Sequence, residues 1–213
     1  MIRKLLLVAA ATAMPFGFIA ATGGIAGATT PIDATHGTVT CTGITGSAKF
    51  SPAVTTDEAA GTSTIAIKAA LTGCTTNDGV TVESAKVAGT LSTTRTAGEN
   101  GCAALVGGSS ATGNLVTTWK TVQKLVSKTS TIAVNSISGS VGGNGHADFN
   151  IPGTTPNGTA SGSFQGTNGG ASDATSAQTT ETASALATTC IGKKGLKVLD
   201  IEAPVSGAAV SLS

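Results

Sequence analysis

Apolar residues recur at every second position along several short stretches of this chain, which is the spacing of a β-strand with one buried face. The clearest case runs from Thr64 to Leu71, where one face carries Ile65, Ile67, Ala69 and Leu71. Weaker alternation involves Val80 and Val82, then Val87, Gly89 and Leu91, and finally Ile132 and Val134. The chain is also rich in Thr and Val, which are good strand formers. The pattern therefore predicts β-sheet.

Turn-forming residues separate these stretches and offer backbones that tolerate positive φ. The turns are expected at Asn77-Asp78-Gly79, Gly98-Glu99-Asn100-Gly101, Gly142-Gly143-Asn144-Gly145, Pro156-Asn157-Gly158 and Asn168-Gly169-Gly170. Short strands between such turns are typical of a β-sandwich or barrel. We expect an all-β single domain with about eight to ten strands. Disorder is the alternative, because Gly-, Ser- and Thr-rich segments often bury too little apolar surface to fold.

One stretch has a helical period instead. Ala183, Leu186, Ala187 and Cys190 fall on one helical face, and Gly192 follows. We expect a short helix from about Gln178 to Cys190, followed by a strand through Leu196, Val198 and Ile201. A low-complexity loop is the alternative.

The four cysteines are Cys41, Cys74, Cys102 and Cys190. An even number of cysteines in an exported chain predicts two disulfides, which four cysteines can form in three ways. If the strand of Cys41 pairs antiparallel with Thr64–Leu71 and the chain turns near Thr56, position 41 lies opposite about position 71, and Cys74 is near. We therefore expect Cys41–Cys74 and Cys102–Cys190. A zinc site is disfavoured because no closely spaced Cys or His pair is present in the sequence.

The start of the chain predicts a removable signal peptide. Arg3 and Lys4 precede an apolar run, and Ala26 and Ala28 supply an A-x-A cleavage site. Residues 1–28 would be removed and residues 29–213, beginning at Thr29, would form the exported domain. A retained transmembrane anchor is the alternative, but Pro15 and several glycines interrupt the run. We expect a secreted or cell-envelope location and no transmembrane helix in the mature chain.

Charge and aromatic content exclude some classes of partner. Loss of Arg3 and Lys4 changes the balance from 12 basic and 11 acidic residues to 10 and 11, so nucleic acid is not an expected partner. The sequence has no Tyr, one Trp and five Phe, which leaves an aliphatic core and too few aromatic residues for the interfacial girdles of a membrane barrel.

Residues able to perform catalysis are few. His36 lies near the expected N-terminus, whereas His146 and Asp148 have the spacing of an imidazole and its orienting carboxylate on one strand face. No G-x-S-x-G elbow accompanies them in the sequence. Two acidic pairs, Asp57-Glu58 and Asp200/Glu202, are interpreted as solvent-facing charges that keep strand edges soluble. No phosphate-binding or calcium-binding loop motif occurs, and we expect no cofactor, no metal site and no enzymatic activity.

Lys120, Lys124 and Lys128 recur at intervals of four residues. They would form a basic stripe on a helix, but Thr and Val flank them, which favours a long loop or an edge strand protected by its lysines.

Four stretches resemble a family of exported actinobacterial all-β proteins of unknown function. They are Gly37-Thr38-Val39-Thr40-Cys41, Leu71-Thr72-Gly73-Cys74, Gly162-Ser163-Phe164 with Gly169-Gly170-Ala171-Ser172, and Lys194-Gly195-Leu196-Lys197-Val198-Leu199. The resemblance implies a secreted all-β domain and supplies no active-site residues.

These observations predict a secreted or cell-envelope β module with a binding or structural role, whose partner, binding residues and oligomeric state the sequence does not identify. One alternative is a channel-forming or envelope-inserted barrel, because many strand positions are small and polar. The other is a hydrolase that uses His146.

Overall fold

The computed structural model describes residues 30–153, 158–166, 172–192 and 194–212. The predicted signal peptide at residues 1–28 and its cleavage site lie outside these residues. So do Pro156 and Asn157 of one predicted turn and residues 168–170 of another. The motif at residues 169–172 falls outside as well, except for its last residue.

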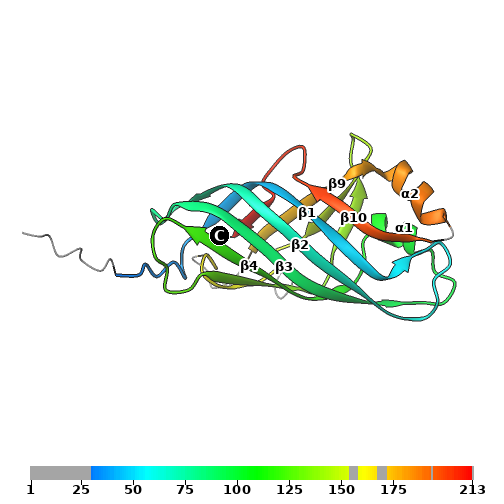
Figure 1. Ribbon diagram of the computed structural model, residues 1–213, viewed down its shortest axis with the longest axis horizontal. Coiled ribbons are helices and arrows are strands. Elements are labelled where there is room, and N and C mark those ends of the chain that lie inside the picture. Colours follow the sequence, from blue (N-terminus) through cyan, green and yellow to red (C-terminus); the bar gives the residue numbers. More distant parts are fainter. Residues whose placement is uncertain (1–29, 154–157, 167–171, 193, 213) are drawn as a thin grey trace, which may run out of the picture.

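Four long antiparallel strands form one wall of the molecule and follow one another in the sheet in chain order (Figure 1). They are β1 (Val39–Val54), β2 (Gly61–Thr76), β3 (Val82–Arg95) and β4 (Ala111–Thr121). At about 3.3 Å per residue, the 16-residue strands β1 and β2 extend roughly 50 Å. Strands this long twist and coil strongly, which curves the wall.

Seven further strands complete the sheet. They are β5 (Thr129–Val134), β6 (Ser138–Val141), β7 (His146–Ile151), β8 (Ala160–Gly162), β9 (Ser172–Thr182), β10 (Leu196–Glu202) and β11 (Val210–Leu212). The strand order is β6-β7-β9-β10-β1-β2-β3-β4-β5-β8, and β11 pairs with both β1 and β9. The described residues thus form eleven strands, slightly more than the eight to ten expected.

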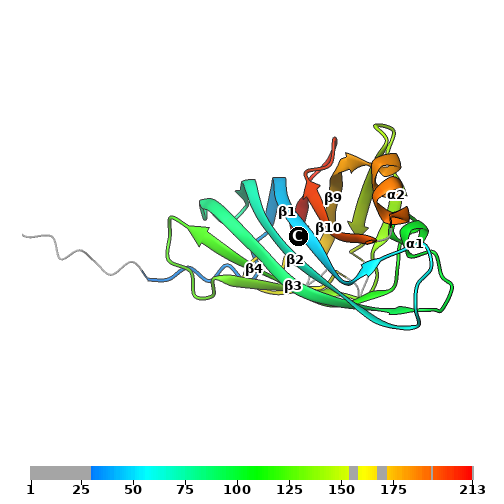
Figure 2. The ribbon, with the colours of Figure 1, turned by 45° about the vertical axis from the view of Figure 1, so that its right-hand side comes forward.

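The sheet curls into a barrel (Figure 2). Ser109, just before β4, exchanges two backbone hydrogen bonds of 2.9 and 3.0 Å with Ile137, just before β6. This bridge brings the β4 side of the sheet against its β6 end. Of the two predicted architectures, sandwich or barrel, the single curled sheet corresponds to the barrel.

The predicted alternation is confirmed in the long strands. Ile65, Ala69 and Leu71 are buried, as are Val87 and Leu91 on the neighbouring strand. The core is aliphatic, as the composition implies, and its main aromatic contact is between Trp119 and Phe164, whose ring centroids lie 5.1 Å apart.

Two short helices lie together at one end of the barrel (Figures 1 and 2). Helix α2 (Ala183–Ile191) is the predicted helix, but it begins at residue 183 because residues 178–182 belong to β9, which pairs with β7 and β10. Helix α1 (Gly101–Gly107) was not predicted. It has only seven residues, too few to show a periodic pattern, and Asn100 caps its N-terminus. Within the described ranges, no helix has the length and hydropathy needed to cross a membrane.

Both predicted disulfides are confirmed. Cys41 and Cys74 lie directly opposite each other on β1 and β2. The turn between these strands is therefore centred one to two residues further along the chain than predicted. The bond between Cys102 and Cys190 joins α1 to α2 with a Cα–Cα distance of 6.0 Å.

Gly46 on β1 allows a close approach of two strands. A Cβ atom at this position would lie 2.3 Å from the Lys68 carbonyl oxygen and 2.6 Å from the Ala69 Cα atom. Glycine is therefore required for the strand packing at this point of the wall.

The three lysines lie on a strand and a loop, without forming a basic helical stripe. Lys120 is on β4, whereas Lys124 and Lys128 lie in the connection from β4 to β5. The edge-strand interpretation is wrong for Lys120, because β4 lies between β3 and β5. Its ammonium group contacts Glu83 at 2.8 Å, and this hydrogen bond raises the pKa of Lys120.

Candidate functional site: an apolar cavity inside the barrel

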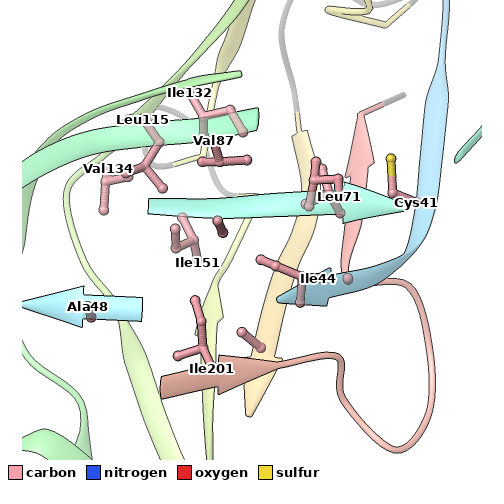
Figure 3. Close-up of a cluster of buried hydrophobic side chains, with 14 of the residues drawn as sticks. Cys41, Ile44, Ala48, Leu71, Val87, Leu115, Ile132, Val134, Ile151 and Ile201 are labelled. Atoms are coloured by element: carbon pink, nitrogen blue, oxygen red, sulfur yellow. The ribbon is translucent and has the colours of Figure 1, made fainter. Parts of the chain in front are cut away.

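The barrel contains a partly open cavity of about 100 Å³. Its walls come from strands β1–β5, β7 and β9–β11, with α1 at one end. Figure 3 shows part of this lining, with Val87, Leu115 and Ile132 on one side and Ile44, Ile151 and Ile201 nearby. Residues from almost the whole length of the chain thus surround one space.

The lining is apolar and uncharged. Every residue around the cavity is aliphatic, phenylalanine, glycine, serine or threonine. The alternation of the strands explains this composition, because the inward positions are those that the sequence fills with Ile, Leu, Val and Ala. A guest in this space would meet dispersion contacts and very few hydrogen-bonding groups.

Three residues of the lining, Ser109, Thr117 and Thr175, carry hydroxyl groups. Thr117 on β4 is fully buried and Thr175 on β9 is partly buried, and both residues line the cavity. Neither Oγ1 atom has a hydrogen-bond partner among the described residues.

Helix α1 closes one end of the cavity. Beneath it lies a second hollow of about 250 Å³, which shares Phe50, Ile65 and Leu105 with the first. Leu105 also lines a third hollow of about 210 Å³ between the two helices. The Cys102–Cys190 bond joins α1 to α2. The position of α1 therefore determines how the cavity connects with the exterior at this end of the barrel.

The second hollow contains a buried ion pair that the sequence interpretation missed. Glu58 was expected to face solvent, but it is only 4% exposed. Its carboxylate accepts hydrogen bonds from Arg95 Nη1 at 2.8 Å and from the Thr55 backbone N–H at 3.0 Å. The correction has a physical reason, since a carboxylate can be buried where a cation and a backbone N–H satisfy it. Its neighbour Asp57 is exposed, as expected.

His146 and Asp148 do not form a hydrogen-bonded pair. A register shift in the β7–β9 pairing lies between them. His146 Nδ1 lies 2.6 Å from the Thr179 carbonyl oxygen. Because that oxygen can only accept, Nδ1 carries the proton and ties the start of β7 to β9. His36 is exposed.

The second acidic pair is split between two environments. Asp200 on β10 is exposed, whereas the partly buried Glu202 accepts a 2.9 Å hydrogen bond from Gln178 Nε2. Glu202 therefore links β10 to β9. Across the described ranges, no cluster of three or more His, Cys, Asp or Glu side chains is placed to hold a metal ion.

Sequence reasoning missed the cavity because alternation marks inward positions without showing whether their side chains fill the space between the walls. The feature of the sequence that could have indicated the cavity was the presence of small residues, such as Ala48, Ala69 and Ala177, at inward positions. Comparison of the chain with protein-family models, with curated proteins and with solved structures finds no match.

Proposed function

We propose that this protein is an exported, non-enzymatic binding module that holds a small apolar molecule inside its barrel. The observation that carries the proposal is the cavity of about 100 Å³ with an apolar, uncharged lining. Ligand sites of this kind are concave and mostly apolar, and barrel interiors are among their common locations. The two disulfides suit an oxidising compartment outside the cytoplasm.

The free-energy cost of an empty apolar cavity supports a role for this cavity in binding. An empty apolar cavity destabilises a fold by about 24 cal/mol per Å³. If water is excluded from it, the cavity of about 100 Å³ represents roughly 2 kcal/mol of lost packing, a sizeable part of a domain's usual 5–15 kcal/mol. A bound guest would restore those contacts, and an engineered apolar cavity of about 150 Å³ is known to accept benzene.

The two alternatives from the sequence receive less support. A channel requires a polar, water-filled lumen, whereas this interior is lined by aliphatic side chains. A hydrolase using His146 would need a nucleophile beside the imidazole, and among the described residues the hydrogen bond of that ring goes to a backbone carbonyl.

A matched pair of substitutions on β2 tests the proposal. Ala69 lines the cavity, whereas Ala70 is exposed on the outer face of the same strand. Ala69→Leu adds three carbon atoms to the cavity, and Ala70→Leu adds the same atoms outside. Benzene binding, followed by NMR chemical shifts of the mature protein, should be lost in Ala69→Leu and kept in Ala70→Leu. Equal binding by both variants, or no binding by the parent protein, would contradict the proposal.

A further inference from the structure

Thr117 is a polar residue in the middle of the apolar wall. It lies on β4, in register with Val87 on β3 and Ser130 on β5, and its side chain is fully buried. Its Oγ1 atom has no partner among the described residues. Thr117 lines the cavity, and its buried hydroxyl belongs to the wall of the space in which a molecule would be held.

Two other buried hydroxyls of the barrel are satisfied within the chain. The Ser130 hydroxyl accepts a 2.7 Å hydrogen bond from Trp119 Nε1 and donates to the Ser163 carbonyl oxygen. The Thr179 hydroxyl accepts from the Ala147 backbone N–H at 3.0 Å. Buried polar groups are nearly always hydrogen-bonded, so the Thr117 hydroxyl, which has no partner among the described residues, is a group that a molecule in the cavity could satisfy.

A second hydroxyl of the same kind belongs to another strand of the barrel. Thr175 is on β9, five places from β4 in the order of the sheet, and its buried Oγ1 atom also lacks a partner in the described residues. Both residues line the same cavity. The two unsatisfied hydroxyls thus belong to one cavity, the one with the apolar lining.

We infer that the guest is an uncharged, mainly apolar molecule with a hydrogen-bonding oxygen, of the ketone, ester or alcohol class, and that Thr117 is the residue that selects for this oxygen. This inference rests on the proposed function. A carboxylate or ammonium group is excluded, because the lining offers no opposite charge to a buried ion. A pure hydrocarbon would leave the Thr117 hydroxyl unsatisfied.

Two probes of nearly equal shape separate the roles of the cavity and the hydroxyl. 2-Pentanone and 2-methyl-1-pentene differ only in an oxygen atom that replaces a methylene group. Each is titrated against the mature protein and followed by NMR chemical shifts. The variants are Thr117→Val, which keeps the branched shape and removes the hydroxyl, and Thr118→Val, the same change on the exposed face of β4.

Thr117→Val should weaken binding of 2-pentanone by roughly 2- to 10-fold, which is the loss of one hydrogen bond, and should leave binding of the alkene unchanged or tighter. Thr118→Val should change the binding of neither probe. Thr117→Ser, which retains the hydroxyl, should keep the preference for the ketone, and it gives a second test if the valine variant folds poorly.

Equal effects of Thr117→Val on both probes, or none on either, would overturn this inference and leave the proposed function intact. Failure of both probes to bind the parent protein would overturn the proposed function as well.

Discussion

The disulfide between the two helices should contribute a large share of the stability of the fold. Cys102 and Cys190 are 88 residues apart in sequence. In the chain-entropy model, closing a loop of this length destabilises the unfolded state by about 5 kcal/mol. Replacing both cysteines with alanine should therefore lower the free energy of unfolding by about this amount, which corresponds to roughly 10–20 °C in Tm for a domain of this size.

The other disulfide provides the comparison. Cys41 and Cys74 are 33 residues apart, so the same model gives about 4 kcal/mol, but backbone pairing of β1 and β2 also holds them opposite each other. Urea denaturation should show a large decrease in the free energy of unfolding for both double-alanine variants. Amide hydrogen exchange in α1 should accelerate selectively only in the Cys102/Cys190 variant. If the Cys102/Cys190 variant lost less than about 1 kcal/mol of unfolding free energy, or if amide exchange in α1 were unchanged, this disulfide would not have the stabilising role described.

Three further substitutions test the packing of the barrel. Gly46→Ala should lower the free energy of unfolding by about 1–3 kcal/mol, because its Cβ would press on the neighbouring strand, whereas Gly143→Ala, with nothing within 4 Å, should be neutral. Glu58→Ala should cost about 3 kcal/mol, because it leaves a largely buried guanidinium unpaired, whereas Glu83→Ala removes only an exposed contact and should have little effect. Thr117→Val should raise the stability of the unliganded protein by about 1 kcal/mol, since it removes an unsatisfied buried hydroxyl.

Urea denaturation of each pair checks these values. Equal losses for the two glycine variants would show that the strands separate at little cost. Equal losses for the two glutamate variants would show that burial adds nothing to the ion pair. A clear loss of stability in Thr117→Val would show that its hydroxyl has a partner in the unliganded protein.

The sequence predicted the local features of the fold and missed those that depend on tertiary contacts. Alternation identified the inner face of β2, and cysteine parity with an antiparallel pairing gave both disulfides. The start of α2 was wrong because strand pairing of residues 178–182 overrode their helical spacing. Glu58 appeared to be a loop charge because its partner, Arg95, is 37 residues away in sequence.

The candidate site was beyond sequence reasoning for a related reason. The cavity depends on the diameter of the closed barrel relative to the volumes of its inward side chains, and neither quantity is local. The unsatisfied hydroxyl of Thr117 is equally hidden, since threonine is also an ordinary strand former.

The most direct test of the account is a crystal structure of the mature protein under xenon pressure. Xenon binds in apolar cavities that are empty of water and needs no polar partner. We expect a well-occupied xenon atom inside the barrel, in contact with Leu115, Ile132 and Ile67. An interior with no xenon at a pressure that loads other apolar cavities, or one filled by ordered water, would contradict the claim that this barrel is built to hold an apolar guest.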